Sequence, residues 1–207
     1  DSVSVSIGNN GLHGQGKIRY RGYSRIAIAY GMANLEESDR SLFLNALLGK
    51  GHNKFTVVNY AADSSEKQGD ALSIRYDFEL QDYVVRAGDD LYINPHLDKE
   101  FQDDIIDMDR PVAGKHFSYK SAQRSVVEFE VPEGYAVDYL PVDVAYEHEM
   151  FGFRLRYSRS DRGFAVNQQT YVSVLELDSG QFEQWNEMVR TLLHAYKESV
   201  VLSKKMR

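Results

Sequence analysis

The sequence predicts a mostly β protein with two packed helices, an α+β fold built from β-sandwich-like modules. Short segments rich in β-branched and aromatic residues recur along the chain, many with alternating apolar and polar positions. Turns that contain Gly, Pro, Asn or Asp separate these segments, whereas helical periodicity is clear in only two places. A length of 207 residues allows one large domain or two small ones.

A β-hairpin is predicted at the start of the chain. Residues 3–7 alternate apolar and polar side chains, and the Gly-Asn-Asn-Gly stretch at residues 8–11 supplies the turn. The second strand is predicted over residues 16–29, with a bulge at Gly22. Its apolar side chains fall on even positions: Ile18, Tyr20, Ile26 and Ile28.

The first helix is predicted over residues 35–49. Asn34 can cap its first turn and Glu37 can complete a capping box, while Gly49 and Gly51 end it. The apolar stripe expected to lie on a sheet comprises Leu35, Leu42, Phe43, Ala46 and Leu47.

Three more strands are predicted before a change of character in the chain. They cover residues 55–61, 71–80 and 83–93, with an exposed polar loop at residues 63–70. Residues 94–111 are crowded with acidic side chains and are predicted to form a solvated linker.

The second half is predicted to contain several strands, one helix and a final strand. The strands cover residues 116–119, 125–131, 137–140, 142–149, 153–160, 163–169 and 171–177. Asp178 or Ser179 is expected to cap an amphipathic helix, and residues 199–203 form the last strand. The apolar positions of the helix are Phe182, Trp185, Met188, Val189, Leu192, Leu193 and Tyr196.

This pattern predicts two β-rich halves joined by the acidic linker. Residues 1–93 form the first half with one helix, residues 94–111 the linker, and residues 112–207 the second half with its helix and short strand. One continuous sandwich is the alternative arrangement.

Composition excludes several classes of function. The chain has 24 Lys and Arg against 31 Asp and Glu, a net charge of -7 that argues against a nucleic-acid partner. It has no cysteine, which excludes disulfides, thiolate metal sites and a cysteine nucleophile. No apolar run is long enough to predict a transmembrane segment. Because the sequence begins at Asp1, we expect it to be a processed or excised piece of a larger protein.

No residue pattern indicates a catalytic, cofactor-binding or metal-binding site. No two of the six histidines are placed as a metal-binding pair at helical spacing, and Glu147, His148 and Glu149 alternate along a strand and cannot converge. The acidic stretch from Asp98 to Asp109 lacks the spacing of a calcium loop. The Gly-x-Ser-x-Gly pattern does not occur. An acid/base hydrolase built from Asp and Glu remains an alternative, since paired carboxylates have no local signature.

Several signatures in a fixed order resemble the region of unknown function that follows the catalytic core in bacterial envelope proteins of the transglutaminase-like family. They are Arg19-Tyr20-Arg21-Gly22-Tyr23, Glu36-Glu37-Ser38-Asp39-Arg40, Gly88-Asp89-Asp90-Leu91-Tyr92-Ile93-Asn94-Pro95, Asp109-Arg110-Pro111-Val112, the stretch from Val131 to Pro141, and Val200-Val201-Leu202-Ser203-Lys204-Lys205. The resemblance implies an exported, β-rich accessory domain in the periplasm or at the cell surface. The catalytic core of that family uses a Cys thiolate, so its catalytic residues have no positions in this cysteine-free chain.

Two functional hypotheses follow from the sequence. The first is a non-catalytic accessory module that scaffolds the core domain of its parent protein or presents substrate to it, and it predicts an exposed apolar patch. The alternative is an independent glycan- or peptide-binding module at the bacterial cell envelope. It predicts a concave surface with exposed aromatic side chains, or a free sheet edge. The sequence leaves the oligomeric state open.

Overall fold

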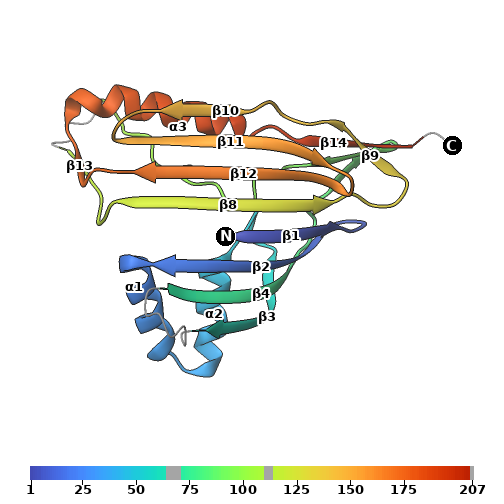
Figure 1. The fold of residues 1–207 in the computed structure, drawn as a ribbon, viewed down its shortest axis with the longest axis horizontal. Helices are drawn as coiled ribbons and strands as arrows, with labels where there is room; N and C mark the ends of the chain where they lie inside the picture. Colours follow the sequence, from blue (N-terminus) through green and yellow to red (C-terminus); the bar gives the residue numbers. More distant parts are fainter. Residues whose placement is uncertain (64–70, 110–113, 206–207) are drawn as a thin grey trace.

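An eight-stranded sheet forms the body of the protein in a computed structural model that describes residues 1–63, 71–109 and 114–205 (Figure 1). Its strand order is β10-β11-β12-β8-β1-β2-β4-β3. The strands are β1 (Ser2–Ile7), β2 (Leu12–Arg21), β3 (Phe55–Asp63), β4 (Ala71–Leu80), β8 (Ser121–Glu130), β10 (Val144–Glu147), β11 (Phe151–Ser160) and β12 (Gly163–Val172). The sequence-based expectation of a mostly β, α+β fold is confirmed.

The predicted opening hairpin is present and brings β1 to the middle of the sheet. The Gly8 amide donates to the Gly11 carbonyl at 2.8 Å and closes the turn. Val3, Val5 and Ile7 are buried and alternate with exposed serines, as the period of two along a strand requires. β1 pairs antiparallel with β2 on one side and parallel with β8 on the other.

Strands from both sides of the predicted linker therefore share one sheet. The parallel register places Ser2 opposite Val126 and Ser6 opposite Glu130, so β1 joins β2, β3 and β4 to the strands of the second half (Figure 1). The described part of the predicted linker, residues 94–109, does not separate two sheets. The division of the chain into two domains stays a prediction, which the cooperativity of unfolding can test.

A helix occupies part of the predicted second strand. β2 ends at Arg21, and α1 (Gly22–Ala33) begins at Gly22, whose φ of 56° lies in the left-handed region that glycine adopts without strain. The prediction of a strand over residues 16–29 was wrong beyond Arg21. The short run with apolar Ile26 and Ile28 fits both a strand and a largely apolar helix, so its period did not distinguish them.

The predicted capping box before the next helix was also wrong. Asn34 closes α1 instead, because its side-chain amide donates to the Tyr30 carbonyl at 2.7 Å. The second helix, α2, spans Glu37–Leu48; the side chain of Glu37 lies outside the described residues. Its buried positions are Leu44 and Leu48, whereas Leu42, predicted to face the sheet, is 71% exposed.

A four-stranded sheet packs behind the first. Its order is β5-β6-β14-β9, with β5 (Val85–Ala87), β6 (Asp90–Ile93), β9 (Tyr135–Tyr139) and β14 (Val200–Lys204). The predicted strand at residues 83–93 is a hairpin that turns at Gly88, where φ is 63°. The predicted loop at residues 63–70 lies outside the described residues except for Asp63, which ends β3.

The last predicted helix is confirmed with its cap. Asp178 and Gln181 form a capping box around a 3-10 turn, η1 (Ser179–Gln181), which leads into α3 (Phe182–Ala195). α3 packs along β10 and β11 near one end of the strand order, while α1 and α2 lie beside β2, β4 and β3 near the other end (Figure 1). Its buried side chains include Trp185, Met188, Val189 and Leu192. The helix could be predicted from the sequence because its apolar residues recur with a period of 3.6.

The predicted strands of the second half are present with shifted ends. β8, β11 and β12 are longer than predicted, whereas the strand predicted at 116–119 is reduced to β7 (Lys115–His116). β7 pairs with β13 (Glu176–Leu177), because the segment predicted over residues 171–177 divides between the end of β12 and β13. No helix among the described residues is long and apolar enough to span a membrane.

Candidate functional site

A polar pocket of about 700 Å3 lies between the start of α1 and the start of β8. Its lining comes from β2, α1, the end of α2, the segment that follows β6, the start of β8, and β12. Its wall-forming side chains are mostly polar or charged, in contrast to those of the two apolar core clusters. A concave site with convergent polar groups is the usual form of a small-molecule site.

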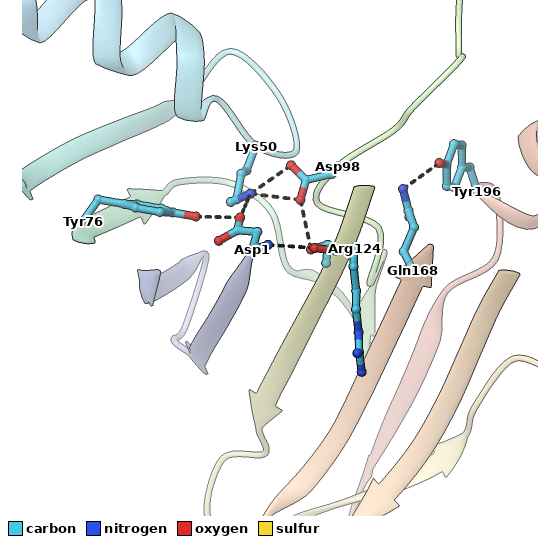
Figure 2. Close-up of polar contacts among 8 residues, drawn as sticks. Asp1, Lys50, Tyr76, Asp98, Arg124, Gln168 and Tyr196 are labelled. Atoms are coloured by element: carbon cyan, nitrogen blue, oxygen red, sulfur yellow. Dashed lines mark hydrogen bonds and ion pairs between the residues drawn. The ribbon is translucent and has the colours of Figure 1, made fainter. Parts of the chain in front are cut away.

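Lys50 forms the floor of the pocket. Its Nζ lies 2.8 Å from a carboxylate oxygen of Asp1 and 2.9 Å from both oxygens of Asp98, and its side chain is only 3% exposed (Figure 2). Local geometry places it there, because α2 ends just before it and the Gly51 amide donates to the Leu97 carbonyl at 2.7 Å. A buried cation is stable only with such partners.

Asp1 connects the floor to the sheet. One of its carboxylate oxygens accepts from the Tyr76 hydroxyl at 2.9 Å as well as from Lys50, and its nitrogen donates to the Arg124 carbonyl at 2.7 Å (Figure 2). The Tyr76 ring lies over Gly16, where any Cβ would collide with it. Burial, followed by the charge of Asp98, raises the pKa of Tyr76, so its hydroxyl stays a donor.

The second oxygen of Asp1, Oδ1, is buried and has no hydrogen-bond partner among the described residues. The side chain of Asp1 is 7% exposed. Figure 2 shows this oxygen directed away from Lys50, while its neighbour holds both contacts. A buried carboxylate oxygen gains free energy from any donor that reaches it.

Amide and acid side chains form the wall along β8 and β12. The Gln123 amide donates to Glu100 at 3.0 Å, and the Gln168 amide donates to the Tyr196 hydroxyl at 3.1 Å. Gln168 and Thr170 are buried polar residues of β12. Burial, assisted by the charge of Asp98, raises the pKa of Glu100 and shifts it toward its protonated form.

Two tyrosines stand at the mouth of the pocket. Tyr23, in the first turn of α1, is 76% exposed, and Tyr119, just before β8, is 43% exposed. They place aromatic rings beside the polar floor, and such rings offer flat apolar faces to a ligand.

α1 also carries an apolar stripe that faces away from the sheet. Tyr23, Ile26 and Tyr30 are 76%, 62% and 73% exposed, and their spacing of three and four residues puts them on one side of the helix. We call these three residues the α1 ridge. On its far side a second pocket, of about 710 Å3, lies between α1, α2 and β3.

Two histidines, His148 and His96, lie in packed surroundings. The ring of His148 stacks on Phe151 with centroids 4.6 Å apart, and Glu147 pairs with Arg154. His96 is buried, with its Nε2 2.9 Å from the Tyr157 hydroxyl. Burial, with a contribution from nearby Lys99, lowers the pKa of His96 to about 4.

The acidic segment is less solvated than predicted. Asp98 pairs with buried Lys50, Asp104 pairs with Lys115 at 2.5 Å, and Glu100 holds Gln123. These three acids therefore have side-chain partners, while the interpretation of residues 94–111 as a linker stays a prediction. Within the described ranges, no group of three or more His, Asp or Glu side chains is placed to hold a metal ion.

The sequence analysis did not find the residues of the polar pocket. Lys50 was given no role, since only Gly49 and Gly51 on either side of it were interpreted, as the end of a helix. Asp98 was interpreted only as one acid among several. A lysine between two glycines does not by itself indicate a buried ion pair. Its partners, Asp98 and Asp1, lie 48 and 49 positions away in the sequence, so no local pattern connects them.

Comparisons of the chain with protein-family models, curated proteins and solved structures found no match.

Proposed function

We propose that this chain is a non-catalytic interaction module of a larger exported protein of the transglutaminase-like type, located in the periplasm or at the cell surface. In this role it holds the core domain of the parent protein or presents substrate to it. The α1 ridge carries the proposal, because it is the exposed apolar patch that such a module needs.

The α1 ridge takes no part in the hydrophobic core that the described residues form beside α1. Ile28 turns the opposite side of α1 into the core at 8% exposure, so α1 is already anchored to the sheet without Tyr23, Ile26 and Tyr30. Contiguous apolar surface is uncommon on a protein that acts alone and is typical of contact sites. Tyrosine is also enriched at the centres of protein interfaces.

The composition supports a non-catalytic role. Because the chain has no cysteine, the chemistry of a transglutaminase-like parent would have to reside in another domain. The proposed partner is therefore that core domain, with the α1 ridge covered in the assembled protein.

Hydrogen exchange in the full-length gene product tests this proposal. The amides of α1 should exchange at least tenfold more slowly there than in the 207-residue chain, since a covered helix opens less often. Ile26→Glu and Tyr30→Glu in the full-length protein should restore fast exchange without unfolding the β strands.

Val142→Glu is the matched control, because Val142 is 75% exposed but lies between β9 and β10, away from α1. It should leave the exchange of α1 unchanged. Equal exchange of α1 in the short and full-length proteins would disprove the proposal.

A further inference from the structure

The floor of the polar pocket is built from buried, fixed polar groups. Lys50 and Asp1 are 3% and 7% exposed as side chains, and Tyr76, Arg124 and Asp98 hold them in place (Figure 2). A floor that is rigid before a ligand arrives costs little conformational entropy on binding.

This floor presents a hydrogen-bond acceptor to a ligand and no uncompensated positive charge. Oδ1 of Asp1 is buried and has no partner among the described residues. The positive charge of Lys50 is already engaged by two carboxylates, and the guanidinium of Arg124 points away from the cluster (Figure 2). At the floor itself an anionic ligand would meet the carboxylates of Asp1 and Asp98, which is unfavourable. The other basic side chains of the lining, Arg19, Arg21 and Lys120, belong to β2 and the segment just before β8 rather than to this floor.

The wall adds groups that can both donate and accept. Gln123, Gln168 and Thr170 present amides and a hydroxyl, and Glu100 is shifted toward its protonated form by burial. An apolar ligand would remove these groups from water without replacing their hydrogen bonds. A ligand with several hydroxyls can satisfy them.

The mouth of the pocket offers a different kind of contact. Tyr23 and Tyr119 stand there with exposed rings, and flat aromatic faces pack against the C–H faces of sugar rings. Polar side chains at the floor and wall, with aromatic rings at the mouth, are complementary to carbohydrates, which combine hydroxyl groups with apolar C–H faces. The volume of about 700 Å3 is within the range of small-molecule sites.

We propose that this pocket binds a neutral carbohydrate, with its hydroxyls toward Asp1, Glu100 and the amides of β8 and β12, and with sugar rings against both Tyr23 and Tyr119. The site shares Tyr23 with the α1 ridge, whereas Asp1, Glu100, Tyr119 and the side chains of β8 and β12 lie outside the ridge. Ile26 and Tyr30, which test that contact, do not line the pocket.

Saturation-transfer NMR on the 207-residue chain tests the proposal with three probes: cellotriose, xylotriose and triacetylchitotriose, each at millimolar concentration. We expect saturation transfer to at least one of them. Tyr23→Ala and Tyr119→Ala should each weaken its binding by about tenfold, since each removes an aromatic contact face.

Tyr30→Ala is the matched control, because Tyr30 is 73% exposed on the same helix but lies outside the pocket. It should leave the affinity unchanged. Thr170→Val tests the wall with a side chain of the same shape and should also weaken binding. Thermal melts followed by the fluorescence of Trp185 verify that each variant is folded.

Two results would overturn the proposal. The first is an absence of saturation transfer to all three probes. The second is binding that Tyr30→Ala weakens while Tyr23→Ala, Tyr119→Ala and Thr170→Val do not, which would place the sugar beside Tyr30 and outside the pocket. Either result leaves the hydrogen-exchange test of the interaction module unaffected.

Discussion

Lys50 places a full positive charge inside the protein, where its two carboxylate partners decide its energetic effect. Removing the cation leaves Asp1 and Asp98 facing each other without compensation, so Lys50→Ala should lower the free energy of unfolding by about 3 kcal/mol. Urea denaturation followed by the fluorescence of Trp185 measures this loss.

Lys54 provides the control for that substitution. It forms an ion pair with Asp82, but the two side chains are 52% and 48% exposed, so water and salt screen them. Lys54→Ala should therefore cost much less than Lys50→Ala. Similar losses for the two variants would show that burial does not strengthen the Lys50 contacts.

His96 makes stability depend on pH. Burial lowers its pKa from 6.5 in an unfolded chain to about 4, so the folded protein holds the neutral imidazole. The stabilisation is complete above pH 6.5 and is lost as the pH falls toward 4, because the unfolded state then binds the proton first. Over this interval the loss from His96 amounts to about 3 kcal/mol.

Urea titrations at several pH values between 7 and 4 measure this dependence. His96→Phe should be less stable at pH 7, because it loses the contact with Tyr157, but its stability should fall less steeply with acid. An unchanged slope in the variant would assign the pH dependence to other groups. Glu100 acts in the opposite direction, since its raised pKa favours the folded state as the pH falls.

Residue-scale contacts of this kind could not be predicted from the sequence. Lys50 meets Asp98 across 48 positions, and His96 meets Tyr157 across 61. Local patterns carry no information about such partners, because they depend on the order of strands in the sheet. The absence of cysteine chemistry, by contrast, follows from composition alone.

At the scale of elements, α3 closes one of the two hydrophobic cores. Leu192 is fully buried there, so Leu192→Ala should lower the free energy of unfolding by about 2 to 5 kcal/mol through lost burial and a cavity. Urea denaturation followed by Trp185 fluorescence reports the change. Gln184→Ala, on the exposed side of α3, should have little effect. A small loss for Leu192→Ala would mean that α3 is loosely packed.

The contrast between α3 and α1 shows what periodicity can and cannot predict. α3 has apolar positions on one side and charges on the other, so only a helix explains its pattern. α1 is apolar on most sides, and the alternation of Ile26 and Ile28 is compatible with a strand. The ambiguity arises from the same exposed apolar residues that form the α1 ridge.

At the scale of the molecule, one continuous sheet should unfold as a unit. β1 is hydrogen-bonded to strands of both predicted halves, so loss of either half exposes its edge. Hydrogen exchange in increasing urea should therefore release the amides of β4 and β12 at the same concentration. Trp185 fluorescence should change in the same transition.

Val5→Ala tests the strand that connects the two predicted halves. Val5 is 2% exposed and pairs with Gly14 of β2 on one side and with Phe129 of β8 on the other. The substitution should lower the urea concentrations at which the amides of β4 and of β12 begin to exchange, and it should lower both by the same amount. Two separate transitions, with only one of them moved by Val5→Ala, would instead support the two-domain division predicted from the sequence.

The strand order of the sheet was not predictable. Each strand could be located from its alternating side chains, and β4 was predicted with its observed bounds, Ala71–Leu80. Which strands become neighbours depends on the packing of the whole chain, because a strand can pair only with a sheet edge that the other strands leave open. The parallel pairing of β1 with β8 is the clearest case, because nothing in residues 2–7 points to a partner so far along the chain.

That pairing has a consequence for how the protein is made. Ser6 pairs with Glu130, which is synthesised 124 positions later. A ribosome needs about 6 to 25 s to add that many residues, so β1 lacks this partner strand for that time. During this interval the open side of β1 can pair with another nascent chain. The serines that alternate along β1 reduce the apolar surface exposed meanwhile, so replacing Ser2, Ser4 and Ser6 with valine should reduce the soluble yield on expression far more than it changes the finished protein.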